Sequence, residues 1–422
     1  MLKNYIKIAF KVFRRRKFFT FISLFAISLT LVVLMVATAA LDHMFGNMLP
    51  ETKQDRTLGV FRTMMKGNGN ISIGAAGYEF INKYVKGLPD VELVSLYEVD
   101  QPVSSFLRGL EVKSQLKRTD GEFWKILEFQ FLEGGPITDE DERNGNFVAV
   151  INVATKERYF GAGPAVGKFI EASTQRFRVV GVVPNVPVYR RIPFADIWVP
   201  VSTSNDPQYR QGIMGNFNAL ILARNTSDIP RIKRDFRAML RKVPLPTSDF
   251  REFYSEAETA FEERAREELG GVYNSDKDYS KTGLGSYASE LTFLLLGAAL
   301  LFMLLPAINL ISINVSRIIE RASEIGVRKS FGASSATLIG QFIVENLILT
   351  FLGGVIGFII SVIVLRMITD SGIIRYAEFH LNIRIFFYAL ASILVFGLMS
   401  GVYPAWKMAR MQPVNALKGS VK

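Results

Sequence analysis

The sequence predicts an integral membrane α-helical protein with four transmembrane helices, one near the start and three near the end, and a large α+β extracytoplasmic domain inserted between helices 1 and 2. Three observations predict this fold class. Four apolar runs are each long enough to cross about 30 Å of hydrocarbon. The segment between the first two runs, residues 42–289, contains no further run of that kind. Lys and Arg gather on what would be one side of the membrane.

The composition agrees with a mixed protein. Of the 422 residues, 49% are hydrophobic and 21% are charged, which suits a soluble domain with a few spans better than a fully embedded transporter. The 50 Lys and Arg outnumber the 39 Asp and Glu. Cysteine is absent, which excludes disulfides, a thiol nucleophile, cysteine metal sites and lipidation of a lipoprotein type.

Residues 1–17 predict a cytoplasmic amphipathic helix lying along the membrane surface. Apolar residues recur at helical spacing, and Lys3, Lys7, Lys11 and Arg14 fall on another side. With Arg15, Arg16 and Lys17 they form a basic cluster that contains no acidic residue. Such a cluster could be a nucleic-acid patch, a solvated face or a topogenic signal. Because it adjoins an apolar run, we interpret it as a membrane anchor and expect no nucleic-acid partner; a plain basic leader is the alternative.

The first predicted span covers residues 18–41. A signal peptide is the alternative, but the run is longer than the usual apolar core of such a peptide. His43-Met44-Phe45 also follows where small cleavage-site residues are expected. We therefore expect an uncleaved transmembrane helix.

Residues 42–289 predict the extracytoplasmic α+β domain. Short β-branched or aromatic runs bounded by Asn, Gly and Pro predict strands at Phe147–Ile151, Phe177–Val183 and Ile197–Val201. Helices are predicted at Gly77–Lys86, Ala154–Phe160 and Ile229–Arg241. The charged run from Ser255 to Leu269, with Glu262 and Arg266 one helical turn apart, is expected to lead back to the membrane, followed by a Gly-rich linker.

Three further spans are predicted at residues 290–316, 342–366 and 385–406. Basic residues follow the second and fourth spans, so residues 317–341 and the tail 407–422 are expected in the cytoplasm, and the short loop 367–384 outside. Both termini are then cytoplasmic in a multi-pass protein of the bacterial inner (plasma) membrane.

No catalytic, cofactor-binding or metal-binding residues are expected. The stretch Gly161 to Lys168 resembles a phosphate loop, but five residues separate its flanking glycines and Phe169 follows the lysine, so it lacks the spacing and the hydroxyl of that motif. The chain has only two histidines, His43 and His380, and no metal-ligand spacing. Gly353, Gly354 and Gly357 predict close helix packing rather than a substrate path.

Residues 317–341 have a specific local pattern. Glu324 and Arg328 are spaced for an ion pair, Gly332 can end a helix, and Ser334 or Ser335 can cap a new short helix entering the third span. Helix, tight turn and helix would form a rigid projection at the cytoplasmic surface. An ordinary loop is the alternative.

That segment resembles the permease domain of the MacB/FtsX family, also called type VII ABC transporters. The resemblance rests on Glu324–Lys329 followed by Phe331–Ser334. A second match is the C-terminal motif, formed by Gly401–Trp406 and Gln412–Leu417. A MacB-like extracytoplasmic domain is similar, in the same order, to residues 131–137, 148–151, 159–161, 166–168 and 179–183. Together these motifs cover most of the chain.

The resemblance implies a permease subunit, not an enzyme, that works as a dimer with itself or a paralogue and with a separate cytoplasmic ABC-type ATPase. ATP hydrolysis would move the extracytoplasmic domain, a process called mechanotransmission, for efflux, export or lipoprotein-type release. A periplasmic adaptor or other envelope partner is a further expectation. The alternatives are an FtsX-like signalling scaffold that activates a cell-wall hydrolase, and a membrane-anchored enzyme.

The resemblance also assigns residues. The expected ATPase-coupling residues are Arg317, Arg321, Glu324, Ile325, Gly326, Arg328, Lys329, Phe331, Gly332, Ala333 and Ser334. The residues of the C-terminal family motif are Pro404, Ala405, Pro413, Ala416 and Leu417. MacB itself carries a fused ATPase, and we expect the ATPase of this chain to come from a separate subunit.

Overall fold

The computed structural model describes the backbone of residues 2–67, 69–107, 109–245, 249–269, 287–301 and 334–377, with single positions between 304 and 395. The chain divides into two compact units. The helical unit contains residues 1–42, 293–373 and 378–422, and the sheet unit contains residues 43–292 and 374–377.

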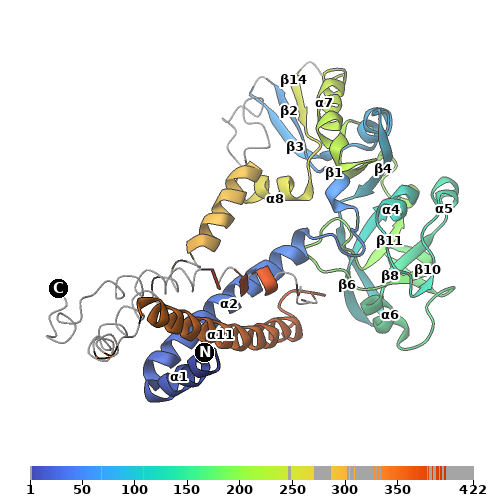
Figure 1. Ribbon diagram of the computed structural model, residues 1–422. Coiled ribbons are helices and arrows are strands. Elements are labelled where there is room, and N and C mark those ends of the chain that lie inside the picture. The colour runs from blue at the N-terminus through green and yellow to red at the C-terminus, as the bar shows by residue number, and fades with distance from the viewer. Residues whose placement is uncertain are drawn as a thin grey trace. The chain divides into compact units, whose positions relative to one another are not determined.

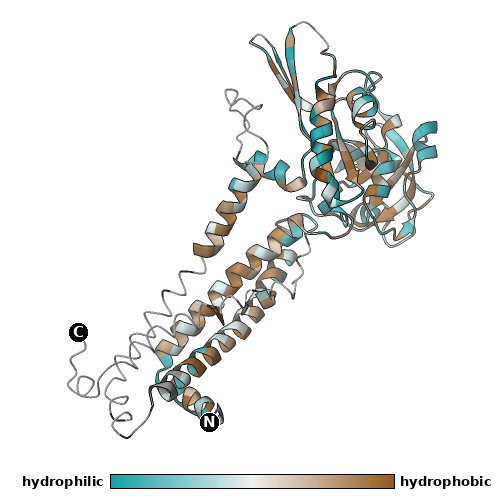
Figure 2. Cartoon of the chain, turned by 45° about the horizontal axis from the view of Figure 1, so that its top comes forward, coloured by the Kyte–Doolittle hydropathy of each residue, from teal (hydrophilic) through white to brown (hydrophobic). Residues whose placement is uncertain are grey.

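The helical unit contains α1 (Leu2–Arg15), most of α2 (Lys17–Phe45) and α11 (Ser335–Asp370). By length and composition, α2 and the part of α11 from Ile343 to Asp370 could each cross a membrane, and a shorter apolar helix covers Tyr287–Leu301. Both long helices are hydrophobic over most of their length (Figure 2). The predicted span at 290–316 is helical from its start to Leu301, and most of its remainder lies outside the described residues. Most of the predicted span at 385–406 also lies outside them.

Glycines allow α2 and α11 to pack closely. A Cβ atom on Gly353 would lie 2.7 Å from Ile27 Cγ2, and one on Gly357 would lie 3.0 Å from Leu31 Cβ. Ile27 and Leu31 are buried at this contact. The prediction that these glycines serve helix packing is therefore confirmed.

The start of α11 follows the predicted cap. The hydroxyl of Ser334 accepts a hydrogen bond from the Thr337 amide at 3.2 Å, which satisfies one of the free N–H groups of the first turn. The predicted short helix and the third span form one continuous helix to Asp370. No residue between Ser334 and Asp370 has the proline or capping pattern that would separate them.

The sheet unit is built on a 14-stranded sheet with the order β14-β2-β3-β13-β4-β6-β11-β8-β10-β7 (Figure 1). Four strands lie off this path, because β1 pairs with β13, β12 with β3, β5 with β6 and β9 with β10. The strands are β1 (Thr57–Val60), β2 (Thr63–Gly67), β3 (Ile71–Ala76), β4 (Val91–Glu98), β5 (Gln101–Leu107), β6 (Leu110–Thr119), β7 (Glu133–Gly134), β8 (Val148–Asn152), β9 (Phe169–Ala172), β10 (Gln175–Val183), β11 (Ile197–Pro200), β12 (Met214–Gly215), β13 (Phe217–Ala223) and β14 (Phe250–Ser255).

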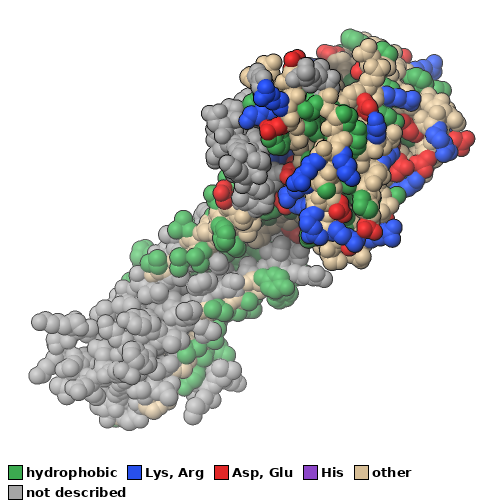
Figure 3. Space-filling view, turned by 90° about the horizontal axis from the view of Figure 1, so that it is seen from above, with side chains coloured by type: hydrophobic (Ala, Val, Ile, Leu, Met, Phe, Trp, Pro, Cys, Tyr) green, Lys and Arg blue, Asp and Glu red, His purple; other side chains and the backbone are tan. Residues whose placement is uncertain are grey.

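Helices cover this sheet and close three hydrophobic clusters. The helices are α3 (Tyr78–Phe80), which continues as a π-helical turn (Ile81–Val85), α4 (Gly121–Ile126), α5 (Asp139–Asn144), α6 (Val153–Phe160), α7 (Ile229–Leu240) and α8 (Ala260–Leu269), with 3₁₀ turns at Gln54–Arg56, Val201–Thr203 and Thr226–Asp228. One cluster packs Phe80 and Phe236 under β13, and another packs Trp124 against Trp198 of the central strand β11. Lys and Arg are interspersed with Asp and Glu over the face of this unit seen in Figure 3.

Most of the predicted elements of this unit are found within a residue or two of their expected bounds, as β8, β10 and β11 show. The helical expectation for Ser255–Leu269 is wrong at its start. Ser255 ends β14, which pairs with β2, and α8 begins at Ala260. The spacing of Glu262 and Arg266 does not produce the contact that such spacing favours, because Glu262 binds Lys233 and Arg266 binds Glu258.

Candidate functional site

The predicted coupling residues are only partly described. Among them, Phe331 is 87% exposed and Ser334 caps α11. Arg317, Arg321, Glu324, Ile325, Gly326, Arg328, Lys329, Gly332 and Ala333 lie outside the described residues, as do Pro404, Ala405, Pro413, Ala416 and Leu417.

The described residues contain a second candidate site within the sheet unit, at the segment of residues 187–196, here called the junction segment. It leads directly into the central strand β11. Lys117 of β6 fixes it by donating hydrogen bonds to the carbonyls of Arg191 at 2.7 Å and Ile192 at 2.8 Å. Burial lowers the pKa of Lys117 to about 8, and the carboxylates of Asp100 and Glu51 oppose that fall.

Arg190 of the junction segment holds the residues at and just after the end of α2. Its Nε donates to the His43 carbonyl at 2.9 Å, its Nη2 to the Gly46 carbonyl at 2.8 Å, and its Nη1 to Glu51 Oε2 at 2.7 Å. The side chains of Arg190 and Glu51 are 1% and 6% exposed. Burial raises the pKa of Glu51, and Arg190 opposes that rise. Each nitrogen of the guanidinium has a partner, which is the condition under which a buried cation is tolerated.

Arg191 holds α8. Its Nη1 lies 2.7 and 2.8 Å from the two carboxylate oxygens of Glu267 and 3.9 Å from Glu263. Burial and the neighbouring Glu267 raise the pKa of Glu263 to about 7. The end of α2 also packs on this helix, because the rings of Phe45 and Phe261 meet edge to face at 5.2 Å.

Asp196 holds the residues that follow α11. Arg375 Nη2 lies 3.0 Å from both carboxylate oxygens, and the Tyr376 hydroxyl donates to Oδ1 at 3.1 Å. The Val188 amide donates to the Arg375 carbonyl at 3.2 Å. Asp196 is fully buried, whereas the Arg375 side chain is 39% exposed.

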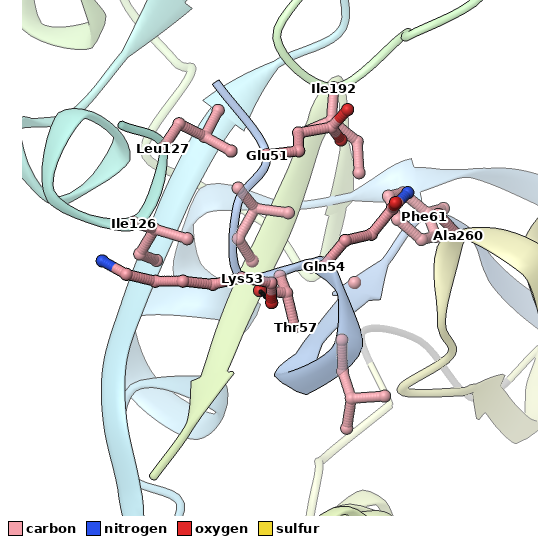
Figure 4. A pocket seen from close by; sticks show the side chains of 12 residues that line it. Glu51, Lys53, Gln54, Thr57, Phe61, Ile126, Leu127, Ile192 and Ala260 are labelled. Atoms are coloured by element: carbon pink, nitrogen blue, oxygen red, sulfur yellow. Dashed lines mark hydrogen bonds between the residues drawn. The ribbon is translucent and has the colours of Figure 1, made fainter. Parts of the chain in front are cut away.

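A small pocket lies beside the junction segment, and Figure 4 shows the residues that line it. Glu51 and Gln54 come from the chain after α2, Ile192 from the junction segment, Ala260 from α8 and Leu127 from the end of α4. In the part of the chain that the structure describes, no group of three or more His, Cys, Asp or Glu side chains gathers as a metal site would require. Buried charges of the junction segment bind chain segments that are distant in the sequence.

Comparison with known proteins decides the family. A model of the MacB-like periplasmic core domain matches residues 20–239, and a model of the FtsX-like permease C-terminal region matches residues 296–413. The chain belongs to the MacB/FtsX-type family of ABC transporter permeases. It is therefore a membrane permease whose sheet unit is an extracytoplasmic α+β domain.

The relatives of this permease include fused and unfused proteins. It is 24% identical over 77% of its length to the macrolide export ATP-binding/permease protein MacB of Wolinella succinogenes, of which it covers 46%. It is 25% identical over 80% of its length to the ABC transporter permease YvrN of Bacillus subtilis, of which it covers 78%. The solved periplasmic region of MacB from Actinobacillus actinomycetemcomitans matches 52% of this chain and 94% of that one at 15% identity, with a TM-score of 0.36.

Sequence reasoning did not find the junction segment. The partners of Arg190 lie 139 residues or more away, and Arg375 and Tyr376 lie 179 and 180 residues from Asp196, so no local spacing reports these contacts. The available signal was two consecutive arginines, Arg190 and Arg191. Arg190 is buried and requires acceptors that the nearby sequence does not supply, whereas the Arg191 side chain is 54% exposed.

Proposed function

We propose that this permease converts ATP hydrolysis by a separate cytoplasmic ATPase into movement of its extracytoplasmic domain, for export or lipoprotein-type release. The observation that carries the proposal is the junction segment. Its Arg190, Arg191 and Asp196 bind residues that continue from α2, precede the second predicted span and follow α11. The polypeptide is continuous, so a displacement at the outer end of these helices has to be transmitted or absorbed there.

The energetics of the junction segment support transmission. A buried arginine with three hydrogen bonds resists separation, because removing one partner of such a pair costs about 3–5 kcal/mol. Lys117 and the strand β11 join the segment to the hydrophobic core of the domain. A force applied at α2 is therefore transmitted through Arg190 and the junction segment to the strand β11. Relatives include macrolide export and pyoverdine export proteins, which favours export over signalling for this permease.

On this proposal, residues 317–341 dock on the ATPase. The amino terminus, residues 317–341 and the carboxy-terminal tail are then all cytoplasmic. Phe331 and Ser334 are the described members of the expected coupling residues, and the Phe331 ring is exposed and accessible to a partner. A second permease subunit, identical or paralogous, completes the complex. Reporter fusions after Lys422 and at Arg328 should be cytoplasmic, and one at Gly271 should be external.

The test is purification of the tagged full-length chain from membranes of its own host, followed by mass spectrometry for an ATPase carrying a phosphate-loop motif. Glu324→Ala and Arg328→Ala should lower the recovered ATPase at least fivefold at equal permease yield. Arg366→Ala is the matched control, because Arg366 lies near the other end of α11 and is 83% exposed. Recovery of an envelope hydrolase in place of an ATPase would refute the export role.

A further inference from the structure

Two sets of contacts at the junction segment differ in how easily they can open. They are here called the Arg190 tie, to His43, Gly46 and Glu51, and the Arg375–Asp196 tie, which includes Tyr376. Arg190 uses Nε, Nη1 and Nη2 at once, and its partner Glu51 is buried with it. If Arg190 left, two backbone carbonyls and a carboxylate would lose a donor inside the protein. Buried acceptors without partners are strongly disfavoured, so this tie is built to stay closed.

The tie between Arg375 and Asp196 has the opposite design. Arg375 reaches the carboxylate through Nη2, and its side chain is 39% exposed, so water can replace the carboxylate around it. Asp196 keeps partners when Arg375 leaves. Its Oδ1 still accepts from Asn152 Nδ2 at 3.0 Å, and its Oδ2 still accepts from the Gln115 amide at 2.8 Å.

The backbone after α11 also favours release. Tyr376 has a φ of +62°, a conformation that a bulky side chain rarely adopts, and its hydroxyl is bonded to Asp196. Opening the tie frees Tyr376 from this constraint. The contact of Arg375 with Asp196, which water can replace, therefore holds the closed state of this tie. The backbone strain at Tyr376 opposes that state.

We propose that the contact of Arg375 and Tyr376 with Asp196 opens and closes once in each transport cycle, while the Arg190 tie stays closed. The junction segment then moves with α2 throughout the cycle and with the loop after α11 in part of it. This inference rests on the proposed function, since the cycle is that of the ATPase-driven permease.

A disulfide lock tests the inference in the purified permease and ATPase complex in lipid nanodiscs. The permease has no cysteine of its own, so Val188→Cys with Arg375→Cys introduces the pair alone. The backbone hydrogen bond between these residues brings their backbones together, and a disulfide requires Cα atoms about 4.4–6.8 Å apart. The fraction of cross-linked permease is measured on a gel as the fraction that maleimide-polyethylene glycol no longer labels.

Oxidation of this variant should lower ATP hydrolysis at least fivefold, and dithiothreitol should restore it. The matched control is Phe106→Cys with Glu111→Cys, an exposed register pair near the tip of the β5–β6 hairpin, which should lose little activity on oxidation. Unchanged hydrolysis with complete cross-linking of the 188–375 pair would overturn the inference, and so would equal inhibition by the control pair.

A second measurement uses the unmodified complex. Hydrogen exchange at the Val188 amide should differ at least fivefold between nucleotide-free and vanadate-trapped complexes, because this amide is bonded to Arg375 only when the tie is closed. Equal exchange in the two states would overturn the inference. If no ATPase purifies with the permease, it is the proposed function that fails, and that outcome is seen before either measurement.

Discussion

Replacing Arg190 by methionine should destabilise the extracytoplasmic domain more than any other single change in the junction segment. The substitution leaves the Glu51 carboxyl buried without its guanidinium partner, and it removes the donors to the carbonyls of His43 and Gly46. Breaking a buried pair of this kind costs about 3–5 kcal/mol. For a domain of this size, each kcal/mol lowers the melting temperature by about 2–4 °C, so the expected loss is about 6–20 °C.

Tryptophan fluorescence during heating of the full-length chain in detergent measures this loss. Trp124 and Trp198 belong to one buried cluster of the domain, with ring centroids 6.1 Å apart, so their emission reports its unfolding. Arg191→Met is the control, because its side chain is 54% exposed and such ion pairs contribute about 0.2–1 kcal/mol. If Arg190→Met lowered the melting temperature no more than Arg191→Met, the reasoning about burial would be refuted.

Two further predictions concern pH and packing. Glu263 has a folded pKa of about 7 against about 4.5 unfolded, so the native state binds more protons between those values and stability falls as pH rises through them. Glu263→Gln should therefore raise the melting temperature at pH 8 by about 2–6 °C and leave it nearly unchanged at pH 4, with an equal gain at both pH values counting against the assignment. Gly353→Val should reduce the yield of folded permease, since even a Cβ would lie 2.7 Å from Ile27 and overpacking costs about 1–3 kcal/mol. Gly340→Val on the same helix meets no atom within 4 Å and should not reduce it, as size-exclusion chromatography can compare.

The features predicted correctly from the sequence are those set by local physics. The length of α2 follows from the thickness of hydrocarbon that an apolar run has to cross. The start of α11 follows from the hydroxyl of Ser334, which caps it. The close packing of α11 on α2 follows from glycines, which carry no side chain. Each of these signals lies within a few residues of the element that it determines.

The error at Ser255 to Leu269 has a different origin. Ser255 is the last residue of β14, which pairs with β2, and this pairing partner lies far away in the sequence. Likewise, Glu262 binds Lys233 of α7 and Arg266 binds Glu258, whereas helical spacing alone favours contact between the two. Long-range partners supplied by the tertiary structure outweigh a weak surface pair.

The sequence by itself determined that this is a membrane permease with an inserted domain, because hydropathy, charge bias and family motifs are all carried by neighbouring residues. Only the tertiary structure decided that Arg190, Arg191 and Asp196 act together. Their partners come from the chain after α2, from α8 and from the chain after α11, and these are brought together by the sheet that positions the junction segment. Buried charges require partners, but a linear sequence does not say where in the chain those partners lie.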